Sequence, residues 1–92
     1  MITKKLKIVV TKTDIRRGAR GDCGNCPIAR AARRAIRASM NISVRRDSIR
    51  WWRERFASDN RFSRLNKKAQ RFIQDFDKGK PVKPFTLFVD RP

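Results

Sequence analysis

The sequence predicts an α+β fold, and two periodicities in its apolar residues are the main evidence. Three segments alternate apolar and polar residues with the period of two that strands show, and a fourth is rich in the aromatic and β-branched residues that strands favour. Two longer segments repeat apolar residues with the period of a helix. Their order along the chain is β-α-β-β-α-β. In a compact domain this order most simply gives a four-stranded antiparallel sheet with two helices on one face, the ferredoxin-like arrangement.

The length of the chain favours a single basic domain that spans residues 1–92. A chain of this size buries roughly 60–65 % of the surface that it exposes when unfolded, so its core is small. The apolar share of 39 % is low, but these residues are concentrated in the periodic segments, which indicates folding rather than disorder.

The N-terminal half contains the first strand and the first helix. Residues 5–11 alternate apolar and polar positions as a strand does, and residues 13–16 suggest a short capped turn that ends at Gly18. A helix then opens at Asn25 or Cys26, because Pro27 suits the first helical position. The apolar face of this helix consists of Ile28, Ala31, Ala32, Ala35 and Ile36.

Two strands are predicted in the middle of the chain. Residues 41–46 alternate, and residues 47–48 suit a tight turn. Residues 49–56 fit either a strand or a helix, and the aromatic and β-branched residues in their first half favour the strand. The polar residues 58–61 are expected to form a loop.

The second helix and the closing strand follow. The helix runs from Ser63 or Asn66 to Lys78, because an apolar stripe with helical spacing extends over this segment. Gly79 is a natural C-terminal stop. Residues 84–90 alternate again and form the last strand.

Charge is the strongest indication of function. The chain has 25 lysines and arginines against 8 acids, a formal net charge of +17, and 16 of the basic residues are arginine. So much like charge opposes folding through self-repulsion, which usually implies a polyanionic partner. Between Ile15 and Arg46 the only acid is Asp22. We therefore expect a nucleic-acid-binding protein, mostly sequence-nonspecific, rather than an ordinary solvated surface. DNA and RNA, and single and double strands, stay open.

Two groups of residues are the predicted contacts. The primary group is a stripe on the first helix, opposite its apolar face and suited to following phosphates: Arg30, Arg33, Arg34 and Arg37. The second group interleaves arginines with aromatic residues and comprises Arg45, Arg46, Arg50, Arg53, Trp51 and Trp52. At least one tryptophan is expected in the core, and the other either joins it there or is a candidate platform on which bases stack.

Cys23 and Cys26 precede the first helix and admit three interpretations. A redox pair is chemically sensible, because a helix N-terminus stabilises a thiolate. A metal such as zinc needs four ligands, and the chain has two cysteines and no histidine. Zinc is therefore expected only if two chains share it or Asp22 contributes. The interpretation we favour is structural, with both side chains shaping the start of the helix.

No catalytic site is expected. Without histidine the chain lacks the commonest general base, and Ser-His or Cys-His activation of a nucleophile is impossible. A pair of carboxylates could in principle support metal-assisted phosphodiester cleavage. Asp75 and Asp77 do not form such a pair, because they are two residues apart on a helix and do not face each other.

Two segments resemble a family of small uncharacterised proteins from bacteriophages and some bacteria. Residues 18–31 have its Gly-x-Arg-Gly-x-Cys-x-x-Cys-Pro-Ile-Ala pattern, and residues 69–85 have its ending, a helix that closes on Phe-Asp-x-Gly before a Pro-Phe strand. The resemblance covers about half the chain and leaves 45–64 unmatched. It implies a phage-type origin and no catalytic role.

Two other functions stay open. A host-takeover factor that binds an acidic host protein would also be strongly basic, and a metal-bridged dimer or redox protein would use the cysteine pair. The sequence contains no signal peptide and no apolar run of the ~18 residues that a membrane span needs. We expect a protein of the cytoplasm, the host cytoplasm if a phage encodes it, with no membrane contact. Its oligomeric state is open.

Overall fold

A computed structural model describes residues 5–36, 41–53 and 56–90, with backbone alone for Arg53, residues 56–61 and Asp90. The order of elements is β1 (Lys5–Val10), α1 (Lys12–Arg17), α2 (Pro27–Ile36), β2 (Asn41–Val44), β3 (Ser48–Arg53), β4 (Phe56–Arg64), α3 (Lys67–Asp77) and β5 (Phe85–Asp90). The predicted α+β class is confirmed.

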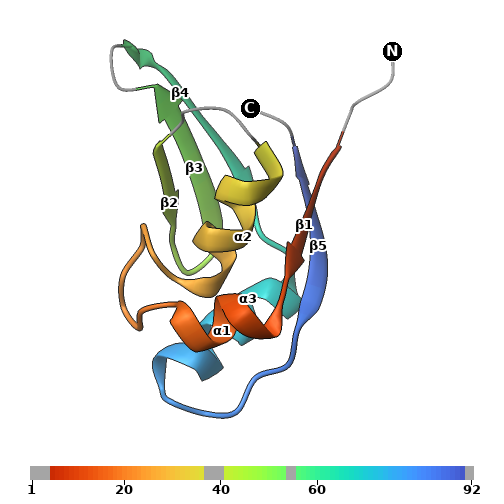
Figure 1. Cartoon of the computed structure of the whole chain (residues 1–92). Helices are drawn as coiled ribbons and strands as arrows, with labels where there is room; N and C mark the ends of the chain where they lie inside the picture. Colours follow the sequence, from red (N-terminus) through yellow and green to blue (C-terminus); the bar gives the residue numbers. More distant parts are fainter. Residues whose placement is uncertain (1–4, 37–40, 54–55, 91–92) are drawn as a thin grey trace.

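The strands form two sheets, so the prediction of a single four-stranded sheet is wrong. β1 pairs antiparallel with β5, and β2, β3 and β4 form an antiparallel meander. Figure 1 shows the two sheets on opposite sides of α2, with α1 and α3 near one end of the molecule. The ferredoxin-like order fails because α1 is a separate helix between β1 and α2, and because β4 is an additional strand before α3.

The prediction of a polar loop at 58–61 is wrong as well, since these residues belong to β4. β4 pairs along β3, and the register places Ser63 opposite Ile49 and Phe62 opposite Arg50. Polar residues are compatible with this strand because it lies at the edge of an antiparallel sheet that has one solvated face. The buried position Ser63 is itself polar. The apolar alternation that marks a strand is therefore missing.

The predicted strand at 49–56 is confirmed in its first part, since β3 covers Ser48–Arg53. Ile49 and Trp51 are both 0 % exposed and face the core, whereas Trp52 points to the other side and is half-buried. This alternation is what a strand requires and a helix excludes.

The ends of α2 and α3 follow the predicted signals closely, whereas the capped turn predicted at 13–16 is the helix α1. α1 begins after Thr11, whose hydroxyl accepts from the Asp14 N–H while the Asp14 carboxylate accepts from the Thr11 N–H, a capping box. α2 begins at Pro27. α3 is capped by the Asn66 side chain, and Gly79 follows it with a φ of +78° that favours glycine.

The core lies between α2 and the inner faces of both sheets. α2 buries four small or branched residues, Ile28, Ala29, Ala31 and Ala32, and the alanines let the helix approach β1 and β2 closely. None of the helices within the described part of the chain is long and apolar enough to cross a membrane.

Candidate nucleic-acid interface

The β2–β3–β4 sheet has one face in the core and one turned away from it. Residues that alternate with the buried ones project from the second face, which we call the outer sheet face: Asn41, Ser43, Ser48, Arg50, Trp52, Phe62 and Arg64. The buried partners in the alternation include Ile42, Val44, Ile49 and Trp51, all in the main core cluster. The outer sheet face is therefore positioned by a rigid core directly beneath it.

The strand register sets the neighbours on this face. Arg50 lies in the middle of the sheet, with Ser43 opposite it on β2 and Phe62 opposite it on β4. Arg64 is opposite Ser48, two residues along β4 from Phe62. Directly opposed side chains in an antiparallel pair have Cβ atoms roughly 4.5–5.5 Å apart, so Arg50 and Phe62 are immediate neighbours.

The charge of this face is positive. Arg50 and Arg64 are exposed, as are Arg45 and Arg46 in the turn between β2 and β3, and none of the four forms an ion pair with another described residue. No described residue on the outer sheet face is acidic. The guanidinium donors of these four arginines are therefore available to an external anion.

Phe62 and Arg64 were missed by the sequence analysis. Phe62 is 65 % exposed, the highest value among the large apolar side chains of the described residues. The sequence gives no apolar alternation at this point, because the buried Ser63 is polar and the exposed Phe62 is apolar. Only the pairing of β4 with β3 shows which face of the sheet Phe62 and Arg64 occupy.

The predicted arginine stripe on α2 has a different environment. Asp14 is 1 % exposed, and its carboxylate accepts hydrogen bonds from both terminal nitrogens of Arg34, at 3.0 and 2.7 Å. Arg34 also donates to the carbonyl oxygen of Val9 at 2.9 Å. Arg30 Nε lies 3.9 Å from Asp14 Oδ1. Arg30 and Arg34 therefore join α2 to α1 and β1.

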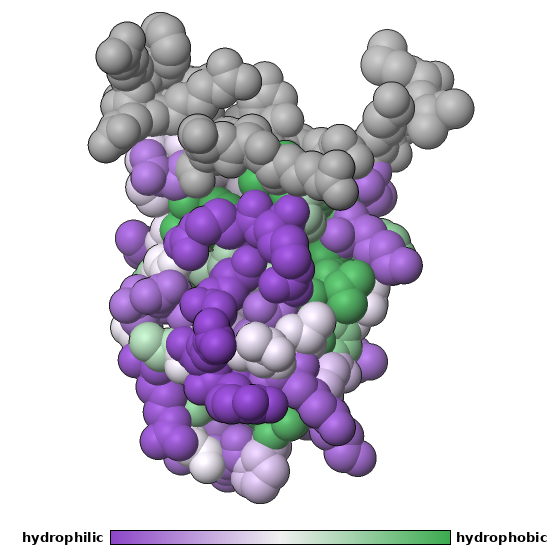
Figure 2. Space-filling view, viewed as in Figure 1, coloured by the Kyte–Doolittle hydropathy of each residue, from purple (hydrophilic) through white to green (hydrophobic). Residues whose placement is uncertain are grey.

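The other two members of the stripe are placed as follows. Arg33 is exposed, and its guanidinium donates to the carbonyl oxygen of Gly24 in the loop before α2. Arg37 lies outside the described residues. Figure 2 looks onto the side of α1 and α2, where hydrophilic side chains gather. This side remains basic, although much of its hydrogen-bonding capacity is used within the protein.

The electrostatics of Asp14 fit a structural carboxylate. Burial raises the pKa of Asp14, but the hydrogen bonds from Arg34 and Thr11 lower it by more, so the net pKa is below its ordinary value. The same pair raises the pKa of Arg34 further. Both groups stay charged at neutral pH.

The residues of the second predicted group divide between the core and the surface. Trp51 is fully buried and cannot stack on a base, whereas Trp52 is on the outer sheet face. Arg45, Arg46 and Arg50 are exposed. Arg53 belongs to β3, but its side chain is outside the described residues.

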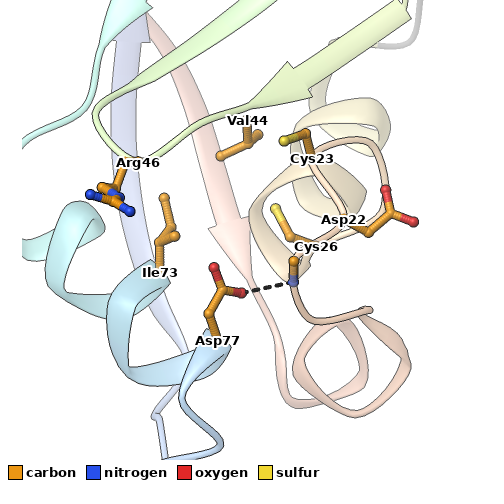
Figure 3. A pocket seen from close by; sticks show the side chains of 8 residues that line it. Asp22, Cys23, Cys26, Val44, Arg46, Ile73 and Asp77 are labelled. Carbon is orange, nitrogen blue, oxygen red and sulfur yellow. Dashed lines mark hydrogen bonds between the residues drawn. The ribbon is translucent and has the colours of Figure 1, made fainter.

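Cys23 and Cys26 line a small pocket of about 130 Å³ between the start of α2, the end of β2 and the end of α3 (Figure 3). Its other side chains include Arg46 and Asp77, and Asp77 accepts a hydrogen bond from the Gly21 N–H at 3.0 Å. The two segments that carry the family resemblance therefore meet at this point. That the chain is related to this family stays a prediction.

The two thiols differ in their surroundings. Cys26 is buried and its sulfur accepts from the Ala29 N–H at 3.4 Å, whereas Cys23 is exposed. Burial raises the pKa of the Cys26 thiol, and Asp77 raises it further, which opposes thiolate formation. Within the described segments no group of three or more cysteine or acidic side chains is placed to hold a metal ion. A zinc ion shared between two chains stays a prediction.

No protein-family model, curated protein or solved structure matches this chain.

Proposed function

We propose that the chain is a small nucleic-acid-binding protein of largely sequence-nonspecific affinity. The observation that carries the proposal is the outer sheet face, where exposed arginines that form no ion pair with another described residue stand beside the exposed Phe62 and the half-buried Trp52. The net charge of +17 supports it, because a field of this size attracts a polyanion over a distance of many ångströms.

The contact set differs from the one that we expected from the sequence. Arg50 and Arg64, with Arg45 and Arg46 at the end of the sheet, are now the primary phosphate contacts. Arg33 is a secondary contact, because one of its donors is used by Gly24. Arg30 and Arg34 contribute charge but hold Asp14, so they are not counted among the direct contacts.

Low sequence specificity follows from the chemistry of these residues. Arginine contacts to phosphates fix the position of a nucleic acid but do not read its bases. Stacking on an aromatic ring tolerates every base, since each has a π-face. The phage-type origin and the absence of catalysis stay predictions.

The test is a binding comparison with protein freed of copurifying nucleic acid. Fluorescence anisotropy would be measured with labelled 15-nucleotide DNA and RNA, a 15-base-pair duplex, and a polyglutamate peptide of matched charge, at 50 mM salt. We expect micromolar or tighter binding to at least one nucleic acid and binding to polyglutamate that is at least about tenfold weaker. Equal binding to polyglutamate would support the acidic host protein instead, and no binding to any nucleic acid would refute the proposal.

A further inference from the structure

The exposed aromatic ring of Phe62 is unusual in its position rather than in its exposure alone. Single exposed apolar side chains are common on protein surfaces and need no explanation. Phe62, however, is directly opposite Arg50, and Arg64 lies two residues farther along the same strand. Each arginine is exposed and has no described ion-pair partner.

Trp52 adds a second ring to the same face. It is two residues from Arg50 on β3 and is half-buried, in contrast to the fully buried Trp51. Residues i and i+2 of a strand point to the same side about 6.5–7 Å apart. The outer sheet face thus presents two aromatic residues that are both next to Arg50, with Arg64 on the edge strand β4.

We propose that the outer sheet face binds single-stranded nucleic acid, with bases stacked on Phe62 and Trp52 and phosphates held by Arg50 and Arg64. This inference rests on the proposed function and names its substrate class. Aromatic side chains that take up successive bases, bordered by cations that hold the backbone, are the usual means of sequence-tolerant single-strand binding.

A duplex fits this face poorly. Its bases cover each other by stacking, so Phe62 would meet no free base face unless base pairs were opened at a cost. The major groove admits a helix or a two-stranded ribbon, whereas this surface is the face of a three-stranded sheet. A duplex would therefore contact the arginines alone.

A second copy of the chain is also disfavoured as the occupant. Each copy has a net charge of +17, and the arginines next to Phe62 would face one another across such an interface. No described acidic residue on this face compensates them. The arginines therefore favour a polyanion, and the aromatic rings favour one whose bases expose apolar faces. A single strand of nucleic acid has both properties.

Variants of Phe62 test the inference, with Phe88 as the matched control. Phe88 is 59 % exposed but belongs to β5 in the other sheet, opposite Lys7. We expect F62A to weaken binding to 15-nucleotide oligothymidine about tenfold or more, because one stacked base is lost. F62W should retain wild-type affinity and F62L should remain weak, whereas F88A should change little. Binding to the duplex should be nearly the same in all four variants.

The other outcomes are equally informative. Equal losses in F62A and F88A, or full affinity in F62L, would overturn the stacking platform while leaving nucleic-acid binding intact. Failure of the wild type to bind any nucleic acid would instead refute the proposed function. Thermal unfolding identifies a variant that fails to fold. If F62A fails to fold, the oligothymidine affinity of F62L, which keeps a large side chain, decides whether the aromatic ring is needed. A dimer that F62A dissociates without a loss of oligothymidine affinity would mark an interface between copies and overturn the inference.

Discussion

Raising the salt concentration from 50 to 200 mM is expected to weaken binding to a single strand several hundredfold. Each phosphate that a protein neutralises releases counterions, and log K falls by about 0.7 per contact for each tenfold rise in salt on a single strand. In the proposed complex the four exposed arginines of the sheet and its turn, the secondary contact Arg33 and about one further cation would make roughly six contacts. The measurement is anisotropy at four salt concentrations. A flat profile would contradict phosphate binding.

The same titration localises the contacts. Replacing Arg50 and Arg64 together by glutamine should reduce the slope of log K against log salt by about 1.4, because two contacts are removed. The matched control replaces Arg16 and Arg17 in α1, both exposed, by glutamine, which removes the same charge from another surface. Its slope should remain close to that of the wild type. Equal reductions in the two double variants would show that net charge alone governs binding.

Replacing Asp14 by alanine is expected to lower the free energy of unfolding by about 3 kcal/mol. Removal of one partner of a buried ion pair costs about 3–5 kcal/mol, because the remaining charge is left uncompensated. The lower value applies since the Arg34 side chain is 54 % exposed and regains water. The loss is large against a total of about 5–14 kcal/mol for a domain of this length.

Urea unfolding at neutral pH measures this effect, and Asp75 in α3 is the control. Its side chain is partly exposed and makes no hydrogen bond or ion pair with another described residue, so D75A should change stability by no more than about 0.5 kcal/mol. A D14A variant as stable as D75A would show that the Asp14 cluster contributes little.

The contribution of Asp14 should also depend on pH. Because its pKa is lower in the folded chain than in the unfolded chain, the unfolded chain binds more protons in acid. The stabilisation is therefore complete above the unfolded pKa of about 3.9 and is lost as the pH falls through the lower folded value. The stability gap between wild type and D14A should be constant from pH 5 to 7 and shrink below pH 4. A gap that widens in acid would contradict this assignment.

Local signals in the sequence predicted most of the helices and strands. They missed β4, and the arrangement of the sheets depends on this strand. Pro27, Asn66 and Gly79 mark helix ends through the conformation and hydrogen bonding of single residues, which tertiary contacts seldom override. β4 has no such local signature. It is stabilised by pairing with β3 and by the Leu65 N–H donating to the Asp47 carbonyl, contacts between neighbouring segments that no single residue of β4 indicates. Because β4 was not predicted, the sequence indicated one four-stranded sheet instead of two separate sheets.

The site was predicted in part for a similar reason. Helical periodicity correctly placed Arg30 and Arg34 opposite the apolar face of α2, but it cannot show which acid lies against them. Asp14 occupies that position because α1 packs beside α2. On β3 the strand alternation places Trp51 in the core and Trp52 on the outer sheet face, and Phe62 lies beside Arg50 only because β4 pairs with β3.

The central claim is that nucleic acid lies on the outer sheet face and not on α2. The most direct measurement is an NMR titration of ¹⁵N-labelled protein with 15-nucleotide oligothymidine. We predict the largest amide shift changes in β3 and β4, at Arg50, Trp52, Phe62 and Arg64. Largest changes at Arg30, Arg33 and Arg34 in α2, with the sheet unaffected, would contradict it.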